Sequence, residues 1–162
     1  MATFALHLAK AAGARVVVTS SSDEKLATAA DLGADIGVNY TTEGWVDQVR
    51  TATDGGVDVV IDSVGSTWPD SINSCRPGGR VVVFGGTGGA KVELMVRPMT
   101  TGQISLLGST MGSPRDFAGL LDAVNAQRWV PVIDSVRPLS EAADAHAREE
   151  AGRHFGKLVL VP

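Results

Sequence analysis

Two short runs of small and hydroxyl side chains stand where a nucleotide could approach the backbone of this chain. The first run, residues 63–66, follows the apolar stretch 57–62 and contains Ser63 and Gly65. Ligands of open parallel sheets bind outside the carboxyl ends of the strands, so this run would let an adenine or a ribose come close. A tight turn from strand to helix needs the same glycine, and this second interpretation stays open.

The second run, Thr19, Ser20 and Ser21, ends another apolar stretch that starts at Arg15. A carboxylate at this point would bind the ribose hydroxyls of NAD and repel a 2′-phosphate. No carboxylate follows this stretch. Its absence also argues against a methyltransferase-like fold, which would need an acidic residue here to hold a ribose. The competing interpretation is structural, because Ser21 and Glu24 have the spacing of a capping box that starts the next helix.

Residues that commonly catalyse reactions are scattered along the chain. His7, His146 and His154 lack the spacing of metal ligands. Asp58 and Asp62 would share one face of a strand, where turn and edge roles fit them better than paired-acid catalysis. No serine–histidine–acid set and no G-x-S-x-G elbow occurs. We therefore expect no catalytic acid, base, nucleophile or metal ligand among these residues.

The glycine-rich loop FGGTGGA, residues 84–90, invites comparison with a phosphate-binding loop. It lacks the Lys-Ser/Thr pair of a P-loop, and no convincing helix starts directly after it. A mobile loop on the substrate side is the better interpretation. Cys75, the single cysteine, cannot form an internal disulfide, and we expect it to be buried or inert.

Composition limits the class of protein and its partners. The 162 residues allow one domain of ordinary size, and 44% apolar residues are enough for a sizeable core. A net charge of −4 gives no broad basic field for nucleic acid. No apolar run approaches the roughly 20 residues of a membrane span. With a single cysteine, these features predict a cytoplasmic protein without nucleic acid or membrane as a partner.

Short apolar stretches and helical patterns alternate from end to end, which is typical of a parallel sheet with crossover helices. The expected strands are residues 15–19, 36–39, 57–62, 80–84, 104–109, 132–136 and 157–161. The expected helices are residues 2–12, 22–32, 43–52, 66–74, one that Ser113 caps, and 141–149. This alternation predicts an α/β fold with a doubly wound parallel sheet, the Rossmann type.

The pattern begins on a helix, whereas a doubly wound nucleotide-binding domain normally opens with a strand and a glycine-rich turn. We therefore predict a Rossmann fold that lacks the first strand and the glycine-rich turn. In the strand order 3-2-1-4-5-6 the missing strand lies at the centre, between stretches 15–19 and 57–62. Both neighbours would expose unpaired edges, so we expect a marginally stable chain.

Several stretches together resemble the medium-chain dehydrogenase/reductases, and among them the quinone oxidoreductases and zinc-type alcohol dehydrogenase-like members. They are FALHLAKAAGARVVVTSSSDEKL, LGADIGVNY, GVDVVIDSVG, CRPGGRVVVFG, ISLLGSTMG and HFGKLVLVP. The resemblance implies that residues 1–162 are an incomplete dinucleotide-binding domain with a C-terminal tail, without the N-terminal catalytic domain. Because the last position of the fingerprint G-x-G-x-x-G/A aligns with Ala2, we expect a start assigned inside a longer reading frame. A deliberate truncation and a decayed gene are the alternatives.

The same resemblance assigns roles to residues at the strand ends. Ser20 and Lys25 would meet the 2′-phosphate of NADP, which makes NAD the less favoured cofactor, and Tyr40 would lie near the adenosine. The residues facing the nicotinamide ribose and carboxamide would be Phe84, Gly85, Gly86, Ser109, Thr110 and Met111. Groups that polarise the substrate, or zinc, would come from the missing domain.

The resemblance thus implies the cofactor-binding portion of an NADP-dependent oxidoreductase. Its reaction would be hydride transfer between NADPH and a small-molecule substrate, which would be a quinone, enone, carbonyl or alcohol. The alternative is a non-catalytic nucleotide-binding or dimerisation module. In either case the strand expected from Ile104 to Ser109 could pair with a second copy across a two-fold axis.

Overall fold

A computed structural model describes residues 2–89 and 91–162 of the chain, and these form two compact units, one that ends at Gly112 and one that spans Ser113–Pro162. Each unit is built from parallel strands and helices, as the alternating pattern predicts. Among the described residues, no helix is long and apolar enough to cross a membrane.

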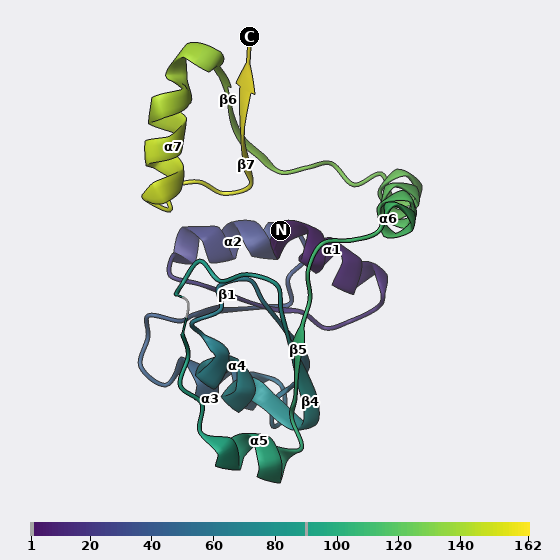
Figure 1. The fold of residues 1–162 in the computed structure, drawn as a ribbon, viewed down its shortest axis with the longest axis vertical. Coiled ribbons are helices and arrows are strands. Elements are labelled where there is room, and N and C mark those ends of the chain that lie inside the picture. Colours follow the sequence, from purple (N-terminus) through teal and green to yellow (C-terminus); the bar gives the residue numbers. More distant parts are fainter. Residues whose placement is uncertain (1, 90) are drawn as a thin grey trace. The chain divides into compact units, whose positions relative to one another are not determined.

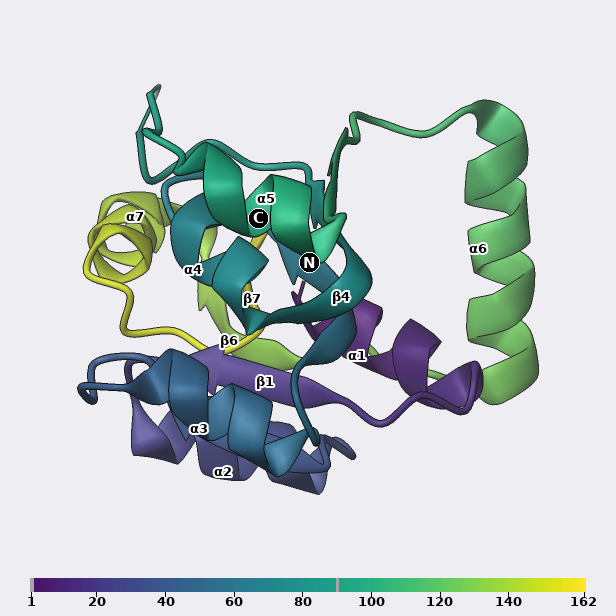
Figure 2. The ribbon, with the colours of Figure 1, turned by 90° about the horizontal axis from the view of Figure 1, so that it is seen from below.

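The first unit alternates helices and strands along its whole length (Figure 1 and Figure 2). Its elements are α1 (Ala2–Ala11), β1 (Val17–Ser20), α2 (Asp23–Asp31), β2 (Ile36–Asn39), α3 (Trp45–Ala52), β3 (Val57–Asp62), α4 (Trp68–Ser74), β4 (Cys75–Val83), α5 (Val96–Gly102) and β5 (Ser105–Gly108). Within this unit, α1 and α2 lie on one side of β1, and α3 and α4 lie on the other (Figure 1). Strand β1 therefore has helices on both sides, which confirms the doubly wound architecture.

The strands of this unit form two separate parallel sheets. One has the order β1-β2 and the other the order β3-β4-β5. Among the described residues no strand pairs with both β1 and β3. The described strands therefore match the predicted fold that lacks its central strand, because the gap lies between β1 and β3, the two strands predicted to flank it.

The main core lies under the three-stranded sheet. Ile72 of α4 and Cys75, Val81 and Val83 of β4 are buried together, and Trp68, Leu106 and four other apolar side chains pack against them. Burial of the apolar surface of such clusters is the main favourable term in folding. The same cluster fixes the end of β4, where predicted site residues begin.

The start of α2 differs from the sequence prediction. Ser22, and not Ser21, is the N-cap residue, and its hydroxyl accepts a hydrogen bond from the backbone N–H of Lys25. Glu24 is then the second residue of the helix, and a lysine occupies the third position. A capping box needs an acidic or amide side chain at that third position, so the predicted box does not form.

Two further elements depart from the expected pattern. Helix α5 was not predicted, because it has only seven residues and contains Pro98 and a pair of threonines. Strand β4 starts at Cys75, five residues earlier than expected, and runs through Pro77 and Gly78. The early part pairs irregularly with β3, with a register shift between Val57 and Val59. Proline and glycine normally mark turns, which hides such a strand from sequence patterns.

The second unit contains α6 (Pro114–Gln127), β6 (Ile133–Pro138), a 3-10 turn (Leu139–Glu141), α7 (Ala142–Glu150) and β7 (Lys157–Val161). Strands β6 and β7 form a parallel pair. Ser113 caps α6 as predicted, with the Asp116 backbone N–H donating to the Ser113 hydroxyl and the Ser113 backbone N–H donating to the Asp116 carboxylate. This unit is the C-terminal part of the chain. The prediction that residues 1–162 form one domain stays a prediction.

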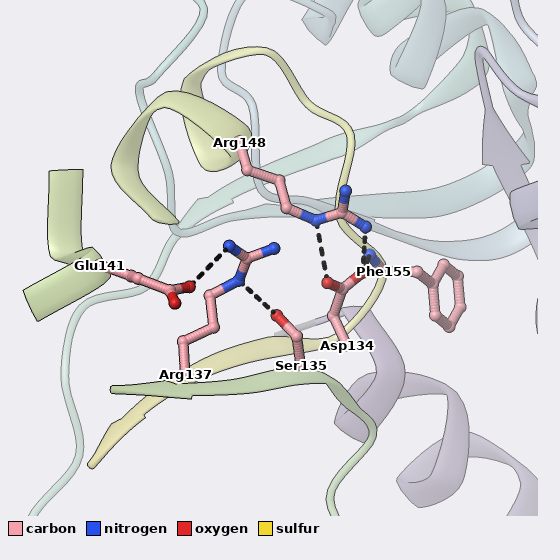
Figure 3. Close-up of polar contacts among 6 residues, drawn as sticks. All are labelled: Asp134, Ser135, Arg137, Glu141, Arg148 and Phe155. Carbon is pink, nitrogen blue, oxygen red and sulfur yellow. Dashed lines mark hydrogen bonds and ion pairs between the residues drawn. The ribbon is translucent and has the colours of Figure 1, made fainter. Parts of the chain in front are cut away.

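Charged side chains fasten α7 to β6 (Figure 3). The Arg148 guanidinium donates two hydrogen bonds, at 3.0 and 3.1 Å, to the two carboxylate oxygens of Asp134. The backbone N–H of Phe155 donates to the same carboxylate at 3.0 Å. These contacts join the helix, the strand and the loop before β7 through one side chain.

The Asp134 contacts predict an acid-sensitive attachment of α7. The hydrogen bond from Arg148, and then that from the Phe155 backbone, lower the pKa of Asp134 to about 2. Because the folded-state pKa is depressed, the stabilisation is complete above about pH 4 and is lost as the pH falls toward 2. An NMR titration of the carboxyl carbon should show this low midpoint, and Arg148→Ala should raise it. An unchanged midpoint in Arg148→Ala would contradict the assignment.

Candidate functional site

A cavity of about 410 Å³ opens at the carboxyl ends of β4 and β5. Its lining consists of Trp68, Val83, Phe84, Gly85, Gly86, Leu106, Leu107, Gly108, Ser109 and Thr110. Five of the predicted site residues, Phe84, Gly85, Gly86, Ser109 and Thr110, are thus brought together. The alternation of strands explains this, because parallel strands end at the same edge of a sheet.

The glycines at the end of β4 have different environments. A Cβ atom at Gly85 would overlap the carbonyl oxygen of Ser63, so the loop after β4 packs directly on the turn after β3. A Cβ atom at Gly86 would meet nothing within 4 Å. Gly85 is therefore required by packing between loops, whereas Gly86 leaves open space beside the cavity.

The turn after β3 is held by a buried carboxylate. Asp62 is 4% exposed, and one of its oxygens accepts hydrogen bonds from the backbone N–H groups of Val64 and Gly65, at 2.9 and 3.0 Å. The other oxygen accepts from the hydroxyls of Thr67 and Ser71, both at 2.8 Å. This geometry confirms the expected turn role of Asp62 and leaves the carboxylate no free side toward a substrate.

These hydrogen bonds also keep the Asp62 carboxyl ionised. Burial alone would raise its pKa, but the four donors outweigh burial and hold the pKa below its ordinary value. Asp58, on the same strand, is exposed and pairs with Arg76. The two carboxylates have different partners and do not form a catalytic pair.

Gly65 supports the tight-turn interpretation at this position. Its φ angle is +90°, and a Cβ atom there would lie 2.6 Å from the carbonyl oxygen of Gly85. Ser63, two residues earlier, is exposed and lies outside the cavity lining. Whether Ser63 and Gly65 contact a nucleotide stays a prediction.

Of the three predicted residues after β5, two line the cavity and Met111 does not. Ser109 and Thr110 line the cavity, and the Ser109 backbone N–H donates to the Val83 carbonyl at 2.8 Å. Met111 is 95% exposed, has a φ angle of +43°, and is outside the lining. The structure therefore brings Ser109 and Thr110 into the cavity and leaves Met111 at its outside.

Ser20, Ser21, Lys25 and Tyr40 form a second group, at the ends of β1 and β2. The Tyr40 backbone N–H donates to the Ser20 carbonyl at 3.0 Å, so these two residues are neighbours across the sheet. The Ser20 hydroxyl accepts from the backbone N–H of Ser22 at 3.2 Å. Tyr40 is 48% exposed, and Lys25 lies half-buried in the first turn of α2.

Trp68 is the cavity residue that sequence reasoning missed most clearly. It packs against the core beneath β4, and its indole Nε1 atom is buried without a hydrogen-bond partner in the described structure. Also missed were Val83, Leu106, Leu107 and Gly108. The sequence could have indicated these four residues, because they are the last residues of predicted strands, and strand ends lie at the edge of the sheet where ligands bind.

One sequence prediction about a reactive group can be compared with the structure. Cys75 is buried as expected, and burial raises the pKa of its thiol to about 11, so the thiol stays protonated at neutral pH. In residues 2–89 and 91–162, no three His, Cys, Asp or Glu side chains are grouped so that they could hold a metal ion.

Comparisons with known proteins give the family. The zinc-binding dehydrogenase family matches residues 1–126. A zinc-type alcohol dehydrogenase-like protein of Schizosaccharomyces pombe is 34% identical over 99% of this chain and 48% of its own length. A NAD-dependent alcohol dehydrogenase of Sulfurisphaera tokodaii is 30% identical over 100% of this chain and 48% of its own.

A solved structure of a NAD-dependent alcohol dehydrogenase superposes with a TM-score of 0.89 at 37% identity, covering 99% of this chain and 47% of that one. The chain thus spans about half the length of the relatives that it matches. These relatives are named alcohol dehydrogenases, and none of those cited is named a quinone oxidoreductase. The matches, the cavity at the strand ends and the doubly wound fold together show that this chain belongs to the zinc-binding dehydrogenase family.

Proposed function

We propose that this chain is the cofactor-binding portion of a nicotinamide-dependent oxidoreductase. The observation that carries the proposal is the cavity at the ends of β4 and β5, which has an open side at Gly86 and polar groups at Ser109 and Thr110. Such a cavity fits the nicotinamide and its ribose. The ends of β1 and β2, with Ser20 and Tyr40, would take the adenosine end.

A bound nicotinamide supplies the hydride, so the protein need only position the ring against the substrate. A cavity lining without a catalytic acid, base or nucleophile is consistent with a protein that positions the nicotinamide while the nicotinamide supplies the hydride. The substrate class would be an alcohol or carbonyl, as the names of the relatives suggest, with a quinone or enone as the alternative. The described residues offer no ligand cluster for zinc, so we assign zinc no role on this part of the chain.

We propose NADP as the preferred cofactor, although two relatives are named NAD-dependent. Strand β1 ends in Ser20 and not in a carboxylate that would repel a 2′-phosphate. The Ser20 hydroxyl accepts one hydrogen bond and keeps its proton available to donate. Asp23, the nearest carboxylate along the chain, accepts a hydrogen bond from the Asn39 amide at 2.7 Å. Lys25 would provide the positive charge for the phosphate.

Substitution of Lys25 tests the choice of cofactor. A charge-assisted contact with a 2′-phosphate is worth about 1.5 to 3 kcal/mol, so Lys25→Ala should weaken NADPH binding roughly tenfold to a hundredfold. NADH binding should stay unchanged, because NADH has no 2′-phosphate. Titration of the purified chain with each cofactor, followed by nicotinamide fluorescence, measures both.

The matched control is Lys10→Ala, which removes a lysine of α1 that pairs with Asp35, just before the amino end of β2 and away from Ser20 and Tyr40 at the carboxyl ends of the strands. It should leave both affinities unchanged. Equal losses for NADPH and NADH in Lys25→Ala would contradict the proposed phosphate contact. Absence of binding by either cofactor to the unsubstituted chain would contradict the proposed function itself.

A second candidate is a nucleotide-binding module that dimerises without catalysis. Strand β5 is an edge strand of the three-stranded sheet, and its residues Ser105 and Leu107 are exposed. An edge of this kind can pair with its copy across a two-fold axis. Sedimentation of the chain tests this second candidate, because a monomer would contradict it. Turnover does not distinguish the two candidates, since the first is a cofactor-binding portion alone.

A further inference from the structure

A second cavity, of about 250 Å³, opens at the other end of β4 from the cavity described above. Cys75 and Pro77 at the start of β4, and Gly102 and Ile104 before β5, belong to its lining. The first cavity is lined at the carboxyl ends of these two strands. The two linings share no described residue, so the second cavity is a separate candidate site.

The guanidinium of Arg50, in the last turn of α3, is held in place at this second cavity. Its Nη1 atom donates to the backbone carbonyl of Asn73 at 3.1 Å and to that of Cys75 at 2.8 Å. Its Nε and Nη2 atoms donate to no residue in the part of the chain that the structure describes. These two nitrogens form the edge of a guanidinium that binds a carboxylate through two parallel hydrogen bonds. Arg50 therefore keeps one complete edge for a ligand.

No anionic side chain of the lining neutralises the charge of Arg50. The described residues around the cavity include no carboxylate. The Cys75 thiol stays protonated at neutral pH, because burial raises the pKa of this thiol to about 11. The carbonyl groups at the end of α4 carry partial negative charge, but those of Asn73 and Cys75 already accept from Arg50. The cavity is therefore positively charged and favours an anion.

The apolar part of the lining determines which anion fits. Ile72, Pro77, Pro98 and Ile104 form apolar walls, and Ile72 and Ile104 are held by the main core. Inorganic phosphate would leave these walls without a partner, whereas an alkyl chain would cover them and gain the hydrophobic contribution. The volume lies below the roughly 300 to 1,000 Å³ of pockets for larger ligands. A carboxylate with an alkyl chain of a few carbons meets both conditions.

We propose that the second cavity binds a short-chain aliphatic carboxylate. The carboxylate accepts hydrogen bonds from Nε and Nη2 of Arg50, and the alkyl chain lies against Ile72 and Ile104. Because the site is at the amino ends of the strands, binding leaves the first cavity open. This inference goes beyond the proposed nucleotide function and does not depend on it.

The test uses the full chain without nucleotide and sodium butyrate as the probe. NMR titration of the ¹⁵N-labelled chain should show saturable shifts of the Arg50 Nε–H signal and of the Thr101 and Gly102 backbone amides. The midpoint of thermal unfolding should rise with butyrate concentration at constant ionic strength, because the ligand binds the folded chain. Butanol and n-butylammonium chloride have the same alkyl chain without the carboxylate, and neither should have these effects.

A pair of matched variants tests the role of Arg50. Arg50→Lys keeps the positive charge but loses the two parallel donors, so it should weaken butyrate binding at least about tenfold. The control is Arg76→Lys, which changes an exposed arginine next to Cys75 that pairs with Asp58 and is outside the lining. It should leave butyrate affinity unchanged.

Three results would overturn the proposal: no saturable shift at Arg50, Thr101 and Gly102, binding of inorganic phosphate as tight as that of butyrate, or equal weakening by Arg50→Lys and Arg76→Lys. If Arg50→Lys does not fold, the comparison of butyrate with butanol, n-butylammonium and phosphate on the unsubstituted chain decides the question.

NADPH titration of the same sample separates this proposal from the proposed function. NADPH affinity should be the same with and without saturating butyrate, because the two cavities share no described lining residue. Competition between the two ligands would place butyrate in the first cavity and overturn the second site. A chain that binds butyrate but not NADPH would contradict the proposed function and support the carboxylate site.

Discussion

Asp62→Ala is expected to destabilise the chain strongly. The substitution removes the acceptor of four hydrogen bonds and leaves the N–H groups of Val64 and Gly65 and the hydroxyls of Thr67 and Ser71 without a partner. The expected loss is about 2 to 4 kcal/mol, a large part of the stability of a small domain. Urea unfolding followed by circular dichroism measures it.

Two substitutions serve as controls for Asp62→Ala. Asp58→Ala, on the same strand, removes an exposed carboxylate paired with Arg76 and should cost at most about 1 kcal/mol. Asp62→Asn keeps an acceptor for the two N–H groups and should lose less stability than Asp62→Ala. If Asp58→Ala and Asp62→Ala destabilise equally, the role of the buried carboxylate is wrong.

The pH dependence of Asp62 has a definite sign. Its pKa is below the ordinary value in the folded chain, so the ionised form stabilises the fold. That stabilisation is complete above about pH 4 and decreases as the pH falls through the folded pKa. In Asp62→Asn, the free energy of unfolding should therefore fall less steeply between pH 4 and lower pH than in the unsubstituted chain.

Gly85→Ala is the second substitution with a large expected effect. The new methyl group would overlap the Ser63 carbonyl, so the loop after β4 and the turn after β3 could not pack together. Forcing an extra methylene into a packed site costs about 1 to 3 kcal/mol, and an overlap with backbone belongs at the upper end. The midpoint of thermal unfolding should fall, and NADPH binding should weaken with it.

Gly86→Ala separates packing from binding. Nothing lies within 4 Å of the position of its Cβ atom, so the stability should change by less than about 0.5 kcal/mol. The methyl group would enter the space beside the cavity, and NADPH affinity should fall all the same. A large loss of stability in Gly86→Ala, or none in Gly85→Ala, would contradict this difference between adjacent glycines.

Much of the fold could be predicted from local patterns. Strand β3 and strand β7 have the predicted bounds, because runs of valine, leucine and isoleucine between turn residues are specific signals. The capping box of Ser113 and Asp116 uses a serine directly before a proline, which is a strong start signal. Helix α5 was missed because a seven-residue helix with an internal proline has no amphipathic pattern to detect.

The candidate site could be predicted only in part. Phe84, Gly86 and Ser109 follow strands in the sequence, and strand ends meet at one edge of the sheet, so they could be named in advance. Trp68 starts a short helix, and nothing in its neighbours along the chain shows that it reaches the cavity.

The sequence by itself determined the alternation of elements and the parallel architecture, because both depend on the period of apolar residues and on turn residues. Only the tertiary structure decided that Asp62 is enclosed by four donors, that Gly85 packs on Ser63 while Gly86 does not, and which residues line the two cavities. These properties depend on distances between segments that are far apart in the chain, and local residue patterns do not encode such distances.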